Sequence, residues 1–304
     1  MPSHYSPIAL FAYRRTRHLT LTLDALERCP EFARSPVFVF SDGPKSTAME
    51  ADVRSVRQML AARRLPNLTI VESPKNNGLA NSIIAGVRRL CDTYGRVIVI
   101  EDDLIASPAL LTWFNDALET YDGVPDVWQI SGHQFPVPAF APRQDSMFLG
   151  FSTSWGWATW KSAWSHFDSD ASGYEALRRD PALRSSFNLN DAYPYAEMLE
   201  RQMAGAVDSW AIRWWWSMFR AGALGLFPPR SLVVNIGCDE TATHASSRLA
   251  RFLQPVRKTN IATQPPSFPT KILLDKEAQG SLEGFLRTQN RKMQWARAIM
   301  ARLK

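Results

Sequence analysis

The chain has 304 residues, enough for one large domain or two small ones with a well-packed core. Hydrophobic residues make up 45% and charged residues 21%, as is ordinary for a globular protein. The formal net charge of +6 favours an anionic partner such as a nucleotide or a lipid head group, although solubility alone accounts for so modest an excess. The charge is spread without a basic stripe interleaved with aromatics, so nucleic-acid binding is not expected.

The cysteines and the hydropathy of the sequence indicate in which cellular compartment the protein is expected. Cys29, Cys91 and Cys238 are odd in number and lack metal-ligand spacing, which favours a reducing compartment without disulfides. The first residues lack the basic and apolar regions of a signal peptide. The most apolar long window, 210–229, contains two arginines and ends in Pro-Pro, so it is too short and too charged to span a bilayer. We therefore expect a soluble, cytoplasmic protein.

The first 131 residues alternate between strand-like and helix-like patterns. Apolar runs predict strands over 7–12, 36–40, 68–71, 97–100 and 127–131. Helix-like patterns lie between them, over 19–26, 47–64, 83–90 and 107–121. Ser107 and Pro108 are a favourable N-cap and first residue for the last of these helices. The alternation predicts an α/β fold in which helices flank a mixed, mostly parallel sheet with right-handed crossovers.

Beyond residue 132 the alternation ends. A Pro-rich loop over 133–142 precedes a segment dense in tryptophan and small residues at 151–164. Helices are expected over 191–204 and 207–221, and a strand over 231–236. The chain from 255 onward has weaker patterning and ends in a basic segment.

Three acids follow the strand at 97–100 directly. Glu101, Asp102 and Asp103 would repel one another and resist burial at the end of a buried strand. A bound Mg²⁺ or Mn²⁺ removes both problems, and such ions complete their shell with phosphate oxygens of a substrate. The alternative is a solvated acidic turn.

Two further loops are expected at the same sheet edge, because ligands of open α/β sheets bind beyond the carboxyl ends of the strands. One is basic and aromatic and holds Tyr13, Arg14 and Arg15, which suits an anionic ligand with a planar base. The other holds Asp42, and Lys75 is placed on the same rim. The sequence has neither a Gly-x-Gly-x-x-Gly pattern after the first strand nor a Walker A loop.

Four motifs resemble those of one enzyme family. They are the strand followed by Glu-Asp-Asp-Leu, Gly-Trp-Ala-Thr-Trp at 156–160, Val-Asp-Ser-Trp at 207–210, and Asn-Ile-Gly at 235–237 with Thr-His at 243–244. They are similar to the nucleotide-diphospho-sugar glycosyltransferases of the GT-A fold, of the family 2 type. The acidic triplet is similar to that of N-acetylglucosaminyltransferase I. The resemblance implies a GT-A, Rossmann-like fold with a nucleotide-sugar-binding half (1–131), an acceptor-binding and catalytic half (132–254) and a basic C-terminal extension (255–304).

The resemblance also implies roles for single residues. Asp103 and His244 would bind a Mn²⁺ or Mg²⁺ ion, while Asp102 and Glu101 would contact the ribose or a ligand water. The nucleotide-sugar would further be held by Tyr13, Arg14, Arg15, Asp42 and Lys75. Asp208 would be the base of an inverting transfer, in a setting made apolar by nearby tryptophans; Ser209 stands where the family has a second acid. From the residues alone, Asp208 could equally cap a helix.

The tryptophans are candidates for acceptor binding, because indole faces stack on the C–H faces of sugars. The candidates are Trp155, Trp157, Trp210 and Trp214, with core packing as the alternative for most of them. Trp214 and Trp216 cannot share a helix face, so at least one is expected in a cleft or on the surface.

The basic segment at 287–304 is expected either to rest on an anionic membrane or to dock on the domain as an ordinary helix. The implied function is transfer of a sugar, from UDP by default, to a saccharide or lipid-linked saccharide in bacterial surface polysaccharide or glycoconjugate synthesis. The alternatives are a non-catalytic carbohydrate-binding protein and a sugar-phosphate nucleotidyltransferase.

Overall fold

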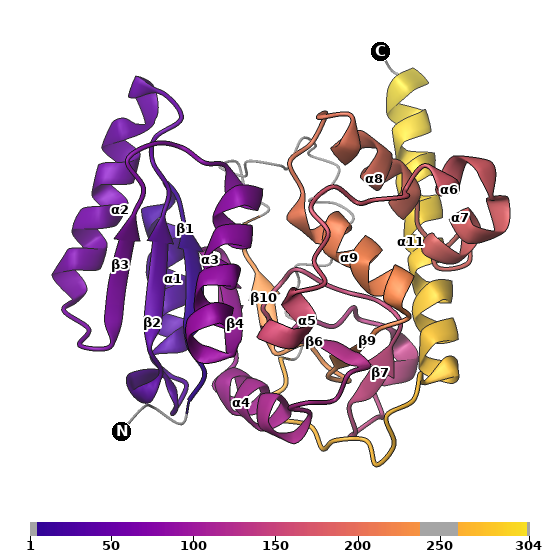
Figure 1. The fold of residues 1–304 in the computed structure, drawn as a ribbon, viewed down its shortest axis with the longest axis horizontal. Coiled ribbons are helices and arrows are strands. Elements are labelled where there is room, and N and C mark those ends of the chain that lie inside the picture. The colour runs from indigo at the N-terminus through magenta and orange to yellow at the C-terminus, as the bar shows by residue number, and fades with distance from the viewer. Residues whose placement is uncertain (1–4, 238–260, 303–304) are drawn as a thin grey trace.

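One eight-stranded sheet runs through the molecule in the order β3-β2-β1-β4-β8-β6-β9-β7 (Figure 1). The computed structural model describes residues 5–237 and 261–302. The strands are β1 (Ile8–Ala12), β2 (Val37–Ser41), β3 (Leu68–Glu72), β4 (Arg96–Glu101), β6 (Val127–Ser131), β7 (Met147–Leu149), β8 (Trp157–Trp160) and β9 (Leu224–Phe227). A separate ribbon pairs β5 (Leu104–Ala106) with β10 (Val233–Asn235).

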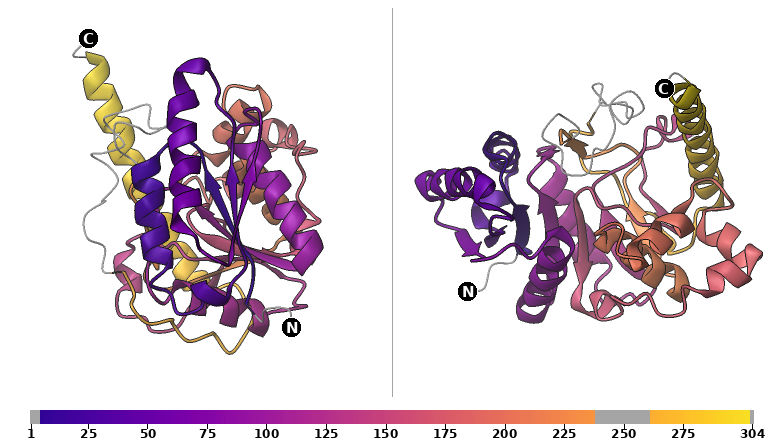
Figure 2. Two further views of the ribbon diagram at one scale, coloured as in Figure 1. Left: turned by 90° about the vertical axis from the view of Figure 1, so that its left-hand side faces the viewer. Right: turned by 90° about the horizontal axis from the view of Figure 1, so that it is seen from above.

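Helices cover both faces of the sheet (Figure 2). They are α1 (Thr16–Leu26), α2 (Glu50–Arg63), α3 (Leu79–Tyr94), α4 (Leu110–Thr120), α5 (Lys161–Trp164), α6 (Ala176–Arg179), α7 (Pro181–Phe187), α8 (Tyr195–Met203), α9 (Trp210–Ala221) and α11 (Lys276–Arg302). Short 3₁₀ turns span Phe32–Arg34, Thr47–Met49 and Pro138–Phe140.

The alternating side chains of β1 and β4 divide the core in two. Ala9 and Phe11 point to the face covered by α3 and α9, whereas Ile8 and Leu10 point to the face covered by α1, α2 and α4. All residues of β1 are buried, because both faces of the strand are covered. The continuous apolar runs of β1 and β4 are therefore those of doubly covered strands, whereas β3 at the edge of the sheet is partly exposed.

The sheet is mixed. β1, β2, β3 and β4 pair in parallel, but β8 lies antiparallel between β4 and β6. This confirms the predicted class, a mixed α/β sheet flanked by helices. The sheet continues without a break across residue 131, where the nucleotide-sugar half was expected to end; that division stays a prediction.

The segment after the acid triplet differs from the expectation. β5 intervenes, and α4 begins at Leu110 and not at Ser107–Pro108. Ser107 instead closes the turn that precedes the helix: its Oγ accepts from the Ala109 backbone N–H, at 3.2 Å, and its carbonyl accepts from that of Leu110, while its own N–H continues the β5–β10 pairing by donating to the Leu232 carbonyl at 2.8 Å. Residues 108–109 then form a turn before the helix.

The C-terminal helix α11 is longer than its docking site. Ala278, Leu282 and Leu286 of its first half are buried, and the second half extends past the body of the molecule (Figure 1). Trp295 on that second half is 70% exposed. In the part of the chain that the structure describes, no helix combines the length and apolarity needed to cross a bilayer.

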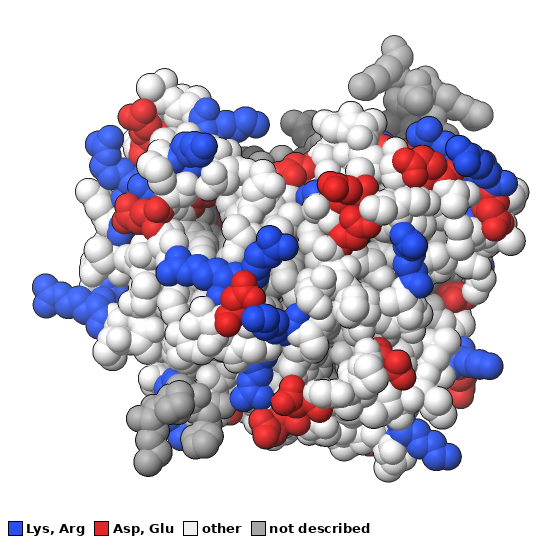
Figure 3. Space-filling view, in the orientation of Figure 1, with Lys and Arg blue, Asp and Glu red and all other residues white. Residues whose placement is uncertain are grey.

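The described cysteines, Cys29 and Cys91, are buried free thiols. Burial raises the pKa of Cys29 to about 11 and that of Cys91 to about 12, so both stay protonated and inert at neutral pH. On the face shown in Figure 3, basic and acidic side chains are interspersed.

Candidate functional site

The loops after β1, β2 and β4 meet at the carboxyl edge of the sheet, as expected. The Arg15 guanidinium donates to Asp102 Oδ1 at 2.5 Å and to Asp103 Oδ2 at 2.8 Å. On the other side, the backbone N–H of Lys45 donates to the Tyr13 hydroxyl at 3.0 Å. The loop after β1 therefore lies between the other two and contacts both.

The last two acids of the triplet are buried at this edge, and Glu101 is half-buried. Asp102 is 5% and Asp103 9% exposed. Burial raises the pKa of Asp102, against the opposing effect of Arg15. Burial, together with the charges of Asp103 and Asp102, raises the pKa of Glu101 to about 8. The raised pKa of Glu101 leaves this acid protonated at pH 7, while Arg15 offsets the charges of Asp102 and Asp103.

The ribbon strand β10 closes one side of the triplet. The Ile236 backbone N–H donates to the Asp103 carbonyl at 2.8 Å, and the Asn235 amide lies 3.5 Å from Asp103 Oδ1. A Cβ atom on Gly237 would lie only 1.9 Å from Asp103 Oδ2. The Asn-Ile-Gly motif therefore packs directly on the last acid, and its glycine provides the room that the carboxylate occupies.

We expect Gly237→Ala to push Asp103 away from Arg15, because the added methyl group and the carboxylate cannot both fit. Overpacking of this kind costs about 1–3 kcal/mol of unfolding free energy, measurable by urea denaturation. Gly284→Ala on α11 is the control, since nothing lies within 4 Å of its added methyl and alanine favours a helix. Equal unfolding free energies of Gly237→Ala and wild type would contradict the proposed crowding.

A divalent ion fits the chemistry of this donor set only in part. The carboxylate oxygens are hard ligands, and Mg²⁺-type ions are often held by one or two carboxylates plus substrate phosphates. However, Arg15 occupies both Asp102 and Asp103, and the described residues contain no cluster of three or more acid, histidine or cysteine ligands. His244 lies outside the described residues. Metal binding would thus require Arg15 to move and a diphosphate to supply oxygens.

Asp42 fastens its loop to the start of α3. Its carboxylate accepts hydrogen bonds from the backbone N–H groups of Gly43, Asn77 and Gly78, at 2.9–3.1 Å, and from the Asn76 side chain. These bonds hold the loop after β2 rigidly at the sheet edge. If Asp42 bound a nucleotide base or ribose, its carboxylate oxygens would have to accept that hydrogen bond in addition to those they already accept.

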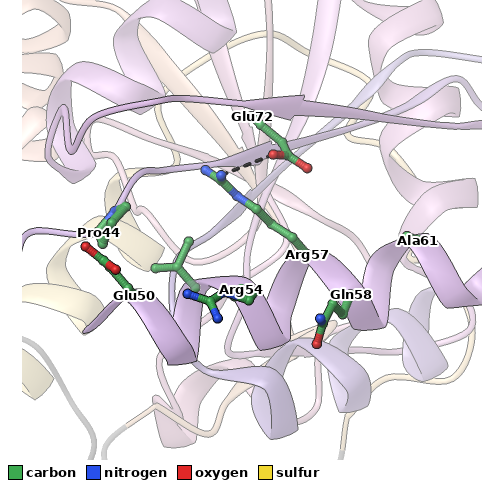
Figure 4. Close-up of a pocket in the computed structure, with 8 residues that line it drawn as sticks. Pro44, Glu50, Arg54, Arg57, Gln58, Ala61 and Glu72 are labelled. Carbon is green, nitrogen blue, oxygen red and sulfur yellow. Dashed lines mark ion pairs between the residues drawn. The ribbon is translucent and has the colours of Figure 1, made fainter. Parts of the chain in front are cut away.

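Sequence patterns did not single out Arg57, which positions the same loop (Figure 4). From α2 its guanidinium pairs with Glu72 at 3.1 Å and donates to the Ser73 carbonyl at 2.7 Å and the Ser41 carbonyl at 3.3 Å. One side chain thus joins the ends of β2 and β3. An arginine in a charged helix gives no sequence signal for such a role.

Two predicted nucleotide contacts point elsewhere. Arg14 pairs with Asp52 of α2, at 3.6 Å, rather than with the triplet. The Lys75 side chain is exposed, and its backbone packs against Gly43. Both lie on the rim of the site, and their roles in binding stay predictions.

Asp208 is exposed at the start of α9, and not in the apolar setting that its tryptophan neighbours suggested. Ser209, not Asp208, is the N-cap of α9. Asp208 Oδ2 instead accepts from the backbone N–H of Ala80 on α3, at 3.4 Å. The partial positive charge of a helix N-terminus attracts an ionised carboxylate. Asp208 therefore borders the loop that Asp42 holds.

Most of the predicted acceptor tryptophans belong to the core. Trp157 and Trp214 are 0% exposed and Trp210 is 3% exposed. Trp157 stacks on Trp210 with 4.8 Å between ring centroids. The expectation that Trp214 or Trp216 would be exposed or in a cleft is wrong: both are buried, because Trp214 packs toward the sheet while Trp216 contacts Phe187 on another side of α9.

Trp155 is half-buried and lines a cavity of about 300 Å³ between α8, α9 and α11. Aromatic residues dominate its walls: His133, Phe135, Phe151, Tyr193, Tyr195 and Trp215. Ser209, next to Asp208, and Leu286 of α11 also contribute. The C-terminal extension is thus part of the cavity wall, which the sequence division did not anticipate.

His133 is a buried, neutral imidazole in this wall. Burial lowers its pKa from 6.5 to about 3. The unfolded chain then binds more protons between these values, so the unfolding free energy falls as pH drops below about 6.5, by up to about 1.4 kcal/mol per pH unit. We expect His133→Gln to reduce this slope in urea denaturation between pH 7 and pH 5.

His166→Gln serves as the control, because His166 is exposed although it also stacks on an aromatic ring, that of Trp128. We expect the pH slope of this variant to match that of wild type. If the unfolding free energy of His133→Gln kept the pH slope of wild type, the pKa of His133 would not differ between the folded and unfolded chain.

Comparisons with known proteins complete the description of the site. No protein-family model and no curated protein matches the chain. Among solved structures, the mannosyltransferase PcManGT from Pyrobaculum calidifontis, in complex with GDP-Man and Mn²⁺, is similar at 14% identity and a TM-score of 0.38, over 73% of this chain and 77% of that one.

Two further structures are similar at the same level. Mouse xyloside xylosyltransferase 1 in its apo form is 12% identical, with a TM-score of 0.37 over 71% of this chain and 82% of that one. The galactosyltransferase LgtC with donor and acceptor sugar analogues is 13% identical, with a TM-score of 0.32 over 57% and 64%. All three are glycosyltransferases. Likenesses this distant do not assign an activity, so function is argued from the residues of the site.

Proposed function

We propose that the chain is a metal-dependent, inverting glycosyltransferase that moves a sugar from a nucleotide-diphospho-sugar to a hydroxyl acceptor. The observation that supports it most is the position of Asp208. This exposed carboxylate lies between the loop held by Asp42 and an aromatic cavity lined by Ser209. Direct displacement at a sugar requires a base between the donor and the acceptor. Asp208 has this position if the sheet edge binds the nucleotide-sugar and the cavity binds the acceptor.

The residues of the sheet edge would bind the donor. Arg15 is the cation nearest the triplet, and it would turn from Asp103 to the diphosphate when a Mn²⁺ or Mg²⁺ ion takes its place. Asp103 would hold that ion, and Asp102 would either stay paired with Arg15 or bind the ribose. A bound ion supplies charge to the leaving diphosphate. Tyr13, already in contact with the loop after β2, would flank the base.

Asp208 would take the proton of the acceptor hydroxyl on the side opposite the leaving group. Because Asp208 is exposed, the acceptor itself would exclude water from it on binding. The expected products are the nucleoside diphosphate and an inverted glycoside. We propose UDP as the default nucleotide, and surface polysaccharide or glycoconjugate synthesis as the setting.

The protruding half of α11 supports a proposal of peripheral membrane contact, with a lipid-linked saccharide as acceptor. Trp295 is 70% exposed there, next to the exposed basic side chains of Arg291 and Lys292. Basic helices with exposed tryptophan bind anionic membrane surfaces. Flotation with anionic and with neutral vesicles tests this contact independently of transfer.

The test of the proposed function is calorimetric titration with UDP, GDP and CDP, each with and without Mn²⁺. We expect one nucleotide to bind tightly only with the ion, which identifies the donor class. Binding of none of the three would leave the aromatic cavity as the functional feature and favour a non-catalytic carbohydrate-binding protein.

A further inference from the structure

The cavity beside Asp208 carries no formal charge. Its ionisable lining groups are the imidazole of His133 and the phenols of Tyr193 and Tyr195, all neutral at pH 7. The rest of the wall is apolar or hydroxyl-bearing. An ionised ligand would therefore lose its hydration in this cavity without gaining a counter-charge.

Several hydroxyl groups of the wall have no protein partner. Within the part of the chain that the structure describes, the side-chain hydroxyls of Tyr195, Ser152 and Ser154 make no hydrogen bond, although Tyr195 is half-buried and Ser152 buried. Unpaired hydroxyls in an enclosed site cost free energy unless a ligand or water satisfies them. Their presence among aromatic rings matches a sugar, which has both hydroxyls and apolar C–H faces.

The cavity adjoins the donor edge of the sheet. Ser231 Oγ lies 3.4 Å from His133 Nδ1, and Asn235, which contacts Asp103, is four residues further along the chain. Four extended residues span at most about 14 Å. A volume of about 300 Å³ is at the small end for ligand sites, which suits one sugar ring rather than an oligosaccharide.

We propose that this cavity holds a single uncharged pyranose of the acceptor and discriminates against anionic sugars. The ring packs against the aromatic wall that includes Trp155, and the Tyr195 hydroxyl bonds one of its hydroxyls. This rests on the proposed function, because it names the acceptor class of the same site. An acceptor bearing a carboxylate or phosphate on this ring is excluded.

The test uses methyl glycosides of glucose, galactose, mannose and N-acetylglucosamine, with methyl glucuronoside as the anionic member. Each is titrated by saturation-transfer NMR with Mg²⁺ and by calorimetry with Mn²⁺, both without nucleotide and with any nucleotide that binds. We expect at least one neutral glycoside to bind, and the glucuronoside to bind at least about ten-fold more weakly than the glucoside.

Tyr195→Phe is the decisive variant, because its hydroxyl has no partner among residues 5–237 and 261–302, so its loss alone should not destabilise the fold. We expect the affinity for the neutral glycoside to fall about five- to ten-fold, as for one lost hydrogen bond. Tyr121→Phe makes the same chemical change at another unpaired phenol in the described chain, packed between Phe148 and Phe268 away from the cavity. It should leave the affinity unchanged.

The outcomes separate the two proposals. If a nucleotide binds but no neutral glycoside does, or the glucuronoside binds as tightly, the acceptor class is wrong while the donor site stands. Unchanged glycoside affinity in Tyr195→Phe also overturns the assignment. If glycosides bind as expected and no nucleotide binds, the cavity assignment holds for a sugar-binding protein and the transferase function fails.

Discussion

Asp103→Ala should abolish Mn²⁺-dependent nucleotide binding, with a loss of affinity of about 100-fold or more in calorimetric titration. Asp103 is the proposed metal ligand, and it shares Arg15 with Asp102. Removing it leaves Arg15 paired with Asp102 alone, so the ion loses its proposed ligand while the guanidinium keeps one partner. Breaking a buried ion pair costs roughly 3–5 kcal/mol when no partner remains. Because Arg15 keeps Asp102, the variant should lose less unfolding free energy than this and stay folded.

The control is Asp52→Ala, which removes the partner of Arg14 in the adjoining loop. Asp52 is 53% exposed at its side chain and outside the triplet, so nucleotide affinity should not change. Urea denaturation of both variants establishes that they are folded under the titration conditions. Undiminished Mn²⁺-dependent binding by folded Asp103→Ala would reduce the acid triplet to a structural turn.

Asp208→Asn should leave nucleotide binding intact and lower kcat by about 10²- to 10⁴-fold, the usual contribution of a general base. The amide keeps an oxygen that can accept from Ala80, and the side chain is exposed, so stability should not change. Transfer is followed by release of the nucleoside diphosphate, and the anomeric configuration of the product is read by NMR. A retained configuration would contradict the inverting mechanism.

Asp170→Asn is the matched control for Asp208→Asn. Asp170 is also exposed. Burial lowers the pKa of Arg213, and the charges of Asp208 and Asp170 both oppose this shift. A general electrostatic effect on α9 would appear in both variants. A loss confined to Asp208→Asn supports the base, whereas normal transfer by that variant would falsify the assignment.

The fold was predictable where strands are apolar runs, whether they are buried as in β1 or partly exposed as in β3. The cores of β1, β2, β3, β4 and β6 were all predicted within one or two residues, because Ile, Val and Phe dominate them. β8 was not: its Trp-Ala-Thr-Trp is too short and mixed to be told from a loop, and only tertiary pairing makes it a strand. β5 was not predicted either. It has three residues, and its partner β10 lies far along the chain, so its pairing leaves no local signal.

The sequence predicts that the loops of the site lie close together, but it does not predict which side chains contact one another. Parallel strands place their carboxyl ends together, so the proximity of Tyr13, Asp42 and Asp103 follows from topology. That Arg15 rather than Arg14 would reach the acids does not, because neighbouring arginines look alike in sequence. Likewise, no periodicity tells which tryptophan lines a cavity, since only Trp155 of the four candidates escapes the core.

The insertion of β8 between β4 and β6 also governs how a nascent chain folds. When the first four strands have left the ribosome, the β4 edge has no neighbour, and an unpaired apolar edge is a template for aggregation. Its partner, Trp157–Trp160, is synthesised much later, and pairings of such large sequence separation form slowly. The β4 edge therefore stays open to pairing with other chains until the second half of the protein has been made and closes the sheet.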